Sequence, residues 1–324
     1  MLWCALSTLH GHDEAWREWR AASGSARMHH AWIISGVKGL GKGLFARAAA
    51  AELVAEQDVR QPEGTAHPDV MVLDHLPLND TEEEKKNEGK PFQVKRNITV
   101  DQVRRMQARL TTRPTLGSRR VVIIDPADDM EKGAVNALLK SLEEPPAGTY
   151  FILVAHRLGR LLPTIRSRCR IMRFSPLNTS EIDEILRHEE PQASAETRAA
   201  AIAAADGSPG AAIAFVEQDL GKLHTLMQRL IAEGDEHFAL RGALAEEIGA
   251  RPDRDRQLAA LDLARAVVAS ELGKDRRRDM QAIAAHGELV KLAGQLPTYN
   301  FDPGLVAMEL GALLASLAMP REAA

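Results

Sequence analysis

The segment from Gly36 to Gly43 carries the clearest chemical signal in the sequence. It reads Gly-Val-Lys-Gly-Leu-Gly-Lys-Gly and matches the phosphate-binding pattern G-x-x-x-x-G-K-[ST] at every position except the last. In that pattern, the serine or threonine hydroxyl holds Mg²⁺, so Gly43 removes the metal ligand. The positions that the pattern assigns to phosphate binding are Gly36, Gly39, Gly41 and Lys42.

The residues around this segment predict the setting that a phosphate-binding loop needs. Residues 31–35 form a short apolar run, and residues 42–55 are rich in alanine, with apolar side chains at helical spacing. The order strand, glycine turn, helix favours a phosphate-binding loop over the alternative, a plain tight turn. Because the hydroxyl is missing, we expect ATP binding here to be vestigial or absent.

Composition limits the classes of function. The chain has 324 residues, 45% of them hydrophobic, which is enough for two or three globular domains. Its formal net charge of -4 argues against a protein that holds DNA by bulk electrostatic attraction, so any contact with nucleic acid must be local or shared. The helix predicted after Thr99 carries three arginines that fit a solvated face better than a DNA contact: Arg104, Arg105 and Arg109.

The cysteines indicate neither a disulfide framework nor a zinc site. Cys4 and Cys169 lie far apart, and neither belongs to a C-x-x-C pair. No signal-peptide pattern is present, and no run approaches the roughly 20 apolar residues of a membrane-spanning helix. We therefore expect a soluble, cytoplasmic protein without membrane contact.

Five short apolar runs alternate with helical patterns in the first half of the chain. Uninterrupted runs of Val, Ile and Leu are typical of strands that are buried on both faces, as in parallel sheets covered by helices. The sequence therefore predicts an α/β fold with a parallel sheet. The predicted strands are residues 31–35, 70–73, 120–125, 150–155 and 170–174.

Beyond Pro176 only helical periodicity remains. We expect three domains: an α/β domain over residues 1–176, a small helical domain over residues 177–219, and a second helical domain over residues 220–324. Within the first of these, residues 78–97 are dominated by Glu, Lys, Asn and Gly, which predicts a solvated, mobile loop rather than a functional charge cluster.

Three segments together resemble one known family. They are residues 121–128 (Val-Val-Ile-Ile-Asp-Pro-Ala-Asp), 136–146 (Asn-Ala-Leu-Leu-Lys-Ser-Leu-Glu-Glu-Pro-Pro) and 165–170 (Ile-Arg-Ser-Arg-Cys-Arg). With His67-Pro68-Asp69 and Gly207-Ser208-Pro209-Gly210, they resemble bacterial clamp-loader subunits of DNA polymerase III, which belong to the AAA+ class. The resemblance implies an AAA+ parallel-sheet nucleotide-binding fold, then an α-helical lid and an α-helical C-terminal collar.

Within this family the chain resembles the delta-prime type, a stator that does not hydrolyse ATP, more than the motor subunits. The resemblance implies that several catalytic groups are lost. Besides Gly43, Pro126 follows Asp125 at the position of the acid that orients the attacking water, and proline has no titratable group. Ala155 stands where motor subunits carry a polar sensor, and Gly210 where they carry the lid arginine.

One functional group is kept. Arg168 lies between Ser167 and Cys169, and the matching arginine of this family reaches into the ATP site of the neighbouring subunit, so the resemblance implies an arginine finger that acts in trans. The alternative is an arginine that pairs with a local carboxylate. Cys169 is expected to pack as a small apolar residue rather than to react.

The resemblance also implies the partners. They are gamma/tau-like ATPase subunits, a delta-like subunit and, through the assembled complex, the sliding clamp and primed DNA. Many relatives carry a four-cysteine zinc module after the first helix, but residues 56–66 contain no cysteine, so we expect no zinc and no required cofactor.

Two other functions stay open from the sequence. The first is a gamma/tau-like motor subunit that hydrolyses ATP itself, and the second is an adaptor that only binds partners. Gly43 and Pro126 argue against the motor subunit, and Arg168 argues against the adaptor.

Overall fold

The computed structural model describes residues 11–25, 28–55, 67–90, 92–273, 276–296, 299 and 301–318. Cys4 and residues 56–66, which bear on the zinc prediction, lie outside the described residues. The chain forms two compact units, Met1–Pro176 and Leu177–Ala324, each with its own arrangement of elements.

The first unit is built around a five-stranded sheet in the order β2-β3-β4-β1-β5, and every paired neighbour runs parallel. The predicted α/β fold with a parallel sheet is confirmed. Alternate residues of β1 face opposite sides, so Trp32 joins one hydrophobic core and Ile33 the other. The strands are β1 (Ala31–Ser35), β2 (Val70–Leu73), β3 (Arg120–Ile124), β4 (Thr149–Ala155) and β5 (Arg170–Arg173).

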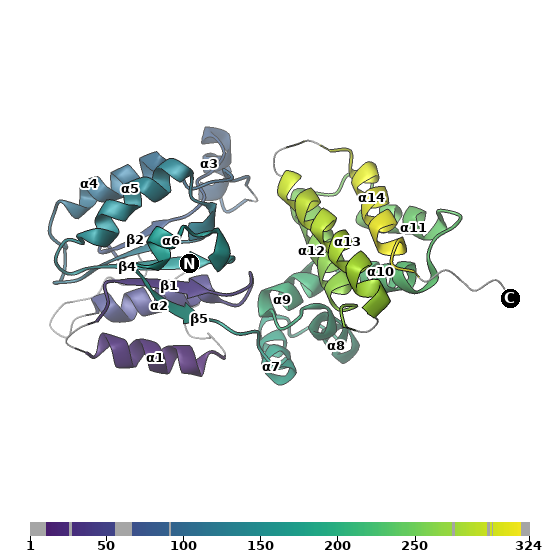
Figure 1. Ribbon diagram of the computed structural model, residues 1–324, viewed down its shortest axis with the longest axis horizontal. Coiled ribbons are helices and arrows are strands. Elements are labelled where there is room, and N and C mark those ends of the chain that lie inside the picture. The colour runs from purple at the N-terminus through teal and green to yellow at the C-terminus, as the bar shows by residue number, and fades with distance from the viewer. Residues whose placement is uncertain are drawn as a thin grey trace. The chain divides into compact units, whose positions relative to one another are not determined.

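Helices cover both faces of this sheet (Figure 1). Helices α1 (Asp13–Ser23) and α2 (Lys42–Val54) pack on one face, where Trp19 and Phe45 are fully buried. Helices α4 (Val100–Leu110), α5 (Lys132–Glu143) and α6 (Pro163–Arg166) pack on the other. The start of α4 has a capping box, in which Thr99 and Gln102 satisfy each other's backbone N–H groups. Among its described residues this unit also has the short 3₁₀ turns η2 (Ala127–Asp129) and η3 (Leu158–Arg160).

The charged segment after β2 contains a helix where its composition predicts a loop. Residues Asp80–Asn87 form helix α3, whose N-cap Asn79 accepts the N–H of Glu82 at 3.0 Å. The side chain of Glu82 is buried and accepts the backbone N–H of Gln93 at 2.6 Å and the ammonium of Lys85 at 2.7 Å. One buried carboxylate therefore ties the helix to the returning chain, and the prediction of a loop is wrong here.

The described part of the second unit is helical. Helices from both sides of the predicted boundary at residues 219 and 220 share one hydrophobic core, in which Leu186, Phe215 and Leu310 are buried. The boundary at residue 219 stays a prediction. The helices are α7 (Thr179–Glu189), α8 (Ala195–Ala204), α9 (Pro209–Glu217), α10 (Gly221–Glu233), α11 (Ala239–Ile248), α12 (Arg254–Ala269), α13 (Arg276–Gln295) and α14 (Pro303–Ala315).

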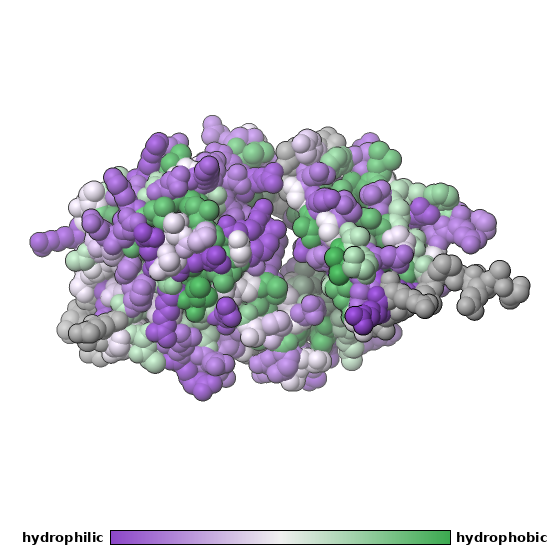
Figure 2. Space-filling model, in the orientation of Figure 1, coloured by the Kyte–Doolittle hydropathy of each residue, from purple (hydrophilic) through white to green (hydrophobic). Residues whose placement is uncertain are grey.

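The surface is mixed in polarity. On the face that Figure 2 shows, hydrophilic residues spread over both units, with hydrophobic residues in smaller groups between them. Large apolar side chains are exposed on the last two helices, including Met280 and Ile283 on α13 and Leu305 on α14. Among the described residues, no helix is both long enough and apolar enough to cross a membrane.

Candidate functional site

The glycine segment forms a turn between the end of β1 and the start of α2, in the order that the sequence predicts. Gly39 and Gly41 have positive φ angles of 86° and 78°, which side-chain-bearing residues rarely adopt. Gly36 lies so close to Phe174 that a Cβ added to Gly36 would be 2.6 Å from the carbonyl oxygen of Phe174. The N–H of Gly36 donates to the carbonyl of Ala155, so the turn is joined to the end of β4.

Lys42 at the start of α2 is turned onto its own loop. Its ammonium donates to the carbonyl oxygen of Val37 at 2.6 Å, and the residue is only 2% exposed. Burial lowers the pKa of Lys42 to about 8, although the charges of Asp125 and Asp128 oppose the shift. The lysine that would contact phosphate is therefore engaged by the protein itself.

Asp125 occupies the place that a side chain at position 43 would need. A Cβ added to Gly43 would lie 2.5 Å from Oδ2 of Asp125. Burial raises the pKa of Asp125, and the nearby charges of Arg47 and Lys42 oppose that shift. The structure thus places the acid of β3 directly against the position that has no hydroxyl, and Arg47 is a neighbour that the sequence analysis missed.

The turn after β3 holds the loop after β4. The carboxylate of Asp128 accepts the backbone N–H of His156 at 2.8 Å and that of Arg157 at 3.1 Å. Pro126, directly after Asp125, is buried and has no group that could act as a base. Asp128 therefore has a structural role that its place in the family motif did not reveal.

His156 follows Ala155 at the end of β4. Burial lowers the pKa of His156 to about 4, with the charges of Lys42 and Lys38 acting in the same direction and that of Asp128 against it. Its Nδ1 atom is buried without a hydrogen-bond partner among the described residues. The imidazole is therefore neutral at pH 7. Ala155 is fully buried, and its methyl side chain has no polar group that could contact a phosphate.

The last of the degenerate positions, Gly210, lies in the second unit, near the start of α9. The structure thus brings Gly36, Gly39, Gly41, Lys42, Gly43, Asp125 and Ala155 together at one edge of the sheet, whereas Gly210 belongs to a separate unit.

Arg168 lies between α6 and β5 and is paired within its own chain. Its Nη2 atom is 2.6 Å from Oε1 of Glu143 at the end of α5, and its Nη1 atom donates to the carbonyl of Thr164 at 2.9 Å. The side chain is still 35% exposed. The alternative to a finger acting in trans was a pairing of Arg168 with a local carboxylate, and the structure contains such a pairing with Glu143.

The strand register separates Arg168 from the phosphate loop of its own chain. Because β1 and β5 run parallel, Trp32 lies opposite Arg170 near the beginning of both strands. The phosphate loop follows the other end of β1, about 13 Å along the strand. Arg168 thus lies at the edge of the sheet where strands begin, and the loop lies at the edge where they end.

The neighbour of Arg168 points into the core. Cys169 packs against the hydrophobic cluster beneath α4, α5 and α6, and burial raises the pKa of its thiol to about 12. A protonated, packed thiol is not a nucleophile at pH 7. This agrees with the packing role expected for Cys169.

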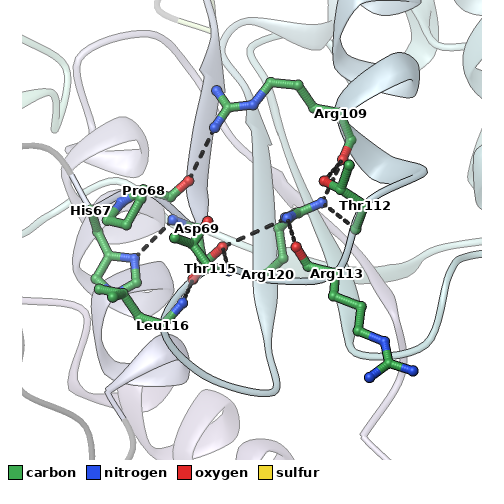
Figure 3. Close-up of polar contacts among 9 residues, drawn as sticks. All are labelled: His67, Pro68, Asp69, Arg109, Thr112, Arg113, Thr115, Leu116 and Arg120. Atoms are coloured by element: carbon green, nitrogen blue, oxygen red, sulfur yellow. Dashed lines mark hydrogen bonds and ion pairs between the residues drawn. The ribbon is translucent and has the colours of Figure 1, made fainter.

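The His67-Pro68-Asp69 motif anchors the loop between α4 and β3 (Figure 3). Asp69 is fully buried, and its carboxylate accepts the backbone N–H groups of Thr115 at 2.6 Å and Leu116 at 2.8 Å. Burial acts to raise the pKa of Asp69, but these hydrogen bonds and the Arg120 charge outweigh it, so the pKa lies below its usual value.

Arg120 completes this anchor from the first position of β3. Its guanidinium donates to the carbonyl groups of Arg109, Thr112 and Arg113 at 2.7, 3.1 and 2.7 Å (Figure 3). Arg109 in turn donates to the carbonyl of Pro68 at 3.3 Å. Arg109 therefore makes a contact within its own chain, which favours a structural role for this α4 side chain over a contact with DNA.

The parallel sheet, the glycine turn at the end of β1 and the helices on both faces define an α/β nucleotide-binding fold of the AAA+ class. The sequence pattern of the family described as "DNA polymerase III, delta subunit" matches residues 11–178. The chain belongs to the delta-prime-like family of DNA polymerase III clamp-loader subunits.

Individual relatives agree with this assignment. The DNA polymerase III subunit delta' of Pseudomonas aeruginosa is 34% identical over 204 residues, which cover 59% of this chain and 57% of that protein. The same subunit of Escherichia coli is 31% identical over 242 residues, which cover 70% of this chain and 67% of that protein. The chain thus spans little more than half the length of the first relative and two thirds of the second.

A solved structure agrees at the level of the fold. A DNA polymerase III gamma subunit-related protein from Thermotoga maritima superimposes with a TM-score of 0.50 and 21% identity, over 94% of this chain and 99% of that chain.

Proposed function

We propose that this chain is a non-catalytic, delta-prime-like stator subunit of the DNA polymerase III clamp loader. It assembles with gamma/tau-like ATPase subunits and a delta-like subunit, and the complex loads the sliding clamp onto primed DNA during replication. Within that complex it supplies Arg168 as an arginine finger to a neighbouring ATP site.

The observation that carries this proposal is the separation of Arg168 from the phosphate loop. The loop lacks a metal-binding hydroxyl at Gly43 and an orienting acid at Pro126, so its own site has lost catalytic groups. Arg168 lies at the opposite edge of the sheet and is partly exposed. A guanidinium in that place serves a nucleotide held by another subunit rather than one held by its own chain.

Arginine suits this task chemically. Its planar guanidinium is always charged and can contact two phosphate oxygens at once, which stabilises charge that builds up during phosphoryl transfer. Arginine fingers contribute about 10³ to 10⁵ in rate in related phosphoryl-transfer enzymes. The catalytic contribution of this chain is therefore one residue, given in trans.

The chain is proposed to need no metal and no nucleotide of its own. The engagement of Lys42 by the Val37 carbonyl and the contact between Asp125 and position 43 support a vestigial site. Exposed apolar side chains on α13 and α14, such as Met280 at 73% and Leu305 at 71%, support assembly through the second unit.

The decisive experiment compares reconstituted complexes that contain the wild-type chain, Arg168→Ala or Arg168→Lys. We expect Arg168→Ala to leave assembly intact and to lower clamp- and DNA-stimulated ATP turnover partially, because other sites take their arginines from motor subunits. Lysine should rescue poorly because an ammonium lacks the planar fork. Equal turnover at equal assembly would reduce the chain to a scaffold.

A second experiment separates the stator from a gamma/tau-like motor subunit. The isolated protein with Mg²⁺ should show no ATP turnover above background. Steady-state phosphate release that Lys42→Ala abolishes would establish the motor function instead.

A further inference from the structure

The guanidinium of Arg168 is oriented by two acceptors on different elements of its own chain. Glu143, the last residue of α5, contacts Nη2 at 2.6 Å, and the carbonyl of Thr164 in α6 accepts from Nη1 at 2.9 Å. Two contacts to the two terminal nitrogens of a planar group fix both its position and its plane.

The backbone beneath this side chain is also fixed. The N–H of Arg168 donates to the carbonyl of Ile165 at 3.1 Å, and Ile165 is fully buried. Cys169 on the other side packs into the core. The freedom that remains is in the long Arg168 side chain, and it is this freedom that Glu143 removes.

The two contacts leave the arginine able to bind an anion. Nη1 also donates to the hydroxyl of Ser167 at 3.5 Å, whereas Nη2 carries a second N–H beside the one that faces Glu143, and 35% of the side chain is exposed. An incoming phosphate oxygen can therefore accept the second N–H of Nη2 on a group whose orientation is already set.

We propose that Glu143 is a positioning residue for Arg168. Its carboxylate orders the guanidinium before a neighbouring nucleotide site closes on it, so less side-chain entropy is lost when the phosphate contact forms. This inference rests on the proposed trans role of Arg168. Since half-exposed ion pairs are individually weak, we expect a modest effect of at most about fivefold on turnover.

The next carboxylate along the chain offers a matched control. Glu144 is exposed and makes no ion pair with any residue that the structure describes. It is the same residue type at the next position of the chain, so Glu144→Gln separates the contact with Arg168 from a general change in local charge.

The test uses reconstituted complexes with Glu143→Ala, Glu143→Gln, Glu144→Gln, Arg168→Ala and the double variant Glu143→Ala/Arg168→Ala. We expect Glu143→Ala to lower kcat for clamp- and DNA-stimulated ATP hydrolysis by a smaller factor than Arg168→Ala, with KM for ATP unchanged. Glu143→Gln, which keeps an acceptor oxygen, should lie between Glu143→Ala and wild type. Glu144→Gln should match wild type, and the double variant should match Arg168→Ala alone.

Three results would overturn the proposal. An increase in turnover with Glu143→Ala would mean that the carboxylate restrains the finger, and equal turnover would mean that the contact has no role. A further loss in the double variant beyond Arg168→Ala would mean that Glu143 acts through another group. If Arg168→Ala itself has no effect, the proposed function fails first, and that outcome is visible in the same experiment.

Discussion

Gly43 and Asp125 pack against each other, so replacing Gly43 alone with a hydroxyl-bearing residue does not recreate a metal-binding site. Asp125 is half-buried, and its Oδ2 atom occupies the space that a Cβ at position 43 would enter. A hydroxyl added there cannot take up the metal-binding position unless the Asp125 side chain first moves.

We therefore predict that Gly43→Ser will not restore ATP turnover and will lower the free energy of unfolding by about 1–3 kcal/mol, as expected for overpacking. Gly133→Ser is the control, because Gly133 is also the second residue of a helix and its added Cβ would meet Val100 at an ordinary 3.6 Å. Urea unfolding followed by tryptophan fluorescence measures both variants. Similar stability of the two variants would contradict the prediction.

His156 makes the stability of the first unit depend on pH. Its pKa is about 4 in the folded protein against 6.5 as the ordinary value, so the unfolded chain binds more protons between these pH values. Above pH 6.5 the imidazole is neutral in both states and this effect is absent, and the stability of the folded state falls as the pH drops from 6.5 toward 4. Because His156 is partly exposed, the loss is on the order of 1–2 kcal/mol rather than the full theoretical value.

We predict that His156→Gln will reduce the difference in unfolding free energy between pH 7 and pH 5 by about 1 kcal/mol, because glutamine does not titrate. Urea unfolding at both pH values gives the two differences. An unchanged pH dependence in the variant would show that other groups, such as Asp125 or Asp129, dominate it.

At the scale of elements, helix α3 depends on one buried side chain. Its composition is that of a solvated segment, but Glu82 joins the helix to Gln93, and the backbone of Leu78 also pairs with Gln93. A buried carboxylate with two strong hydrogen bonds can order a segment that has little apolar surface to bury.

We predict that trypsin will cut the wild-type protein slowly at the lysines of this segment and will cut Glu82→Ala faster, with the two fragments staying associated through the sheet. Glu83→Ala is the control, because Glu83 is exposed on the same helix. Mass spectrometry of the fragments identifies the cleavage sites. Rapid cleavage of the wild type there would restore the view of a mobile loop.

The loop between α4 and β3 shows a second use of buried charge at this scale. The carboxylate of Asp69 accepts backbone N–H groups of this loop, and the guanidinium of Arg120 donates to backbone carbonyl groups in and next to it. Two buried side chains therefore satisfy both the donors and the acceptors of the loop backbone. Removing one partner of a buried pair costs more than the pair contributes, because the other charge is left unpaired.

At the scale of the whole molecule, each unit has its own hydrophobic cores. The sheet unit is built on the two clusters that flank its strands, and the helical unit on a third cluster that contains no residue of the first unit. All four tryptophans of the sequence lie within the first 32 residues, so their fluorescence reports on the sheet unit alone.

We predict that a fragment ending at Pro176 folds by itself and unfolds in urea with a tryptophan transition close to that of the full chain. If the free energy of unfolding of the fragment differs from that of the full chain by more than about 2 kcal/mol, or if the fragment shows no cooperative transition, the sheet unit depends on the helical unit for its stability. Circular dichroism provides an independent measure of its folding.

The sequence alone was sufficient for the sheet, the glycine turn and the family. Apolar runs of strand length, the glycines before Lys42 and the motif around Arg168 are local patterns, and each is set by residues close together in the chain. The same local reading failed for residues 80–87, because the stability of α3 comes from a contact between Glu82 and Gln93 that composition does not reveal.

The tertiary structure decided what the site residues face. That Asp125 fills the space at Gly43 and that Glu143 holds Arg168 both depend on residues brought together from separate elements. That Lys42 turns to the carbonyl of Val37 depends on the conformation of its own loop. The placement of Arg168 opposite its own phosphate loop depends on the register between β1 and β5. Spacing along the chain cannot give these relations, because parallel strands join residues more than 100 positions apart through the fold of everything between them.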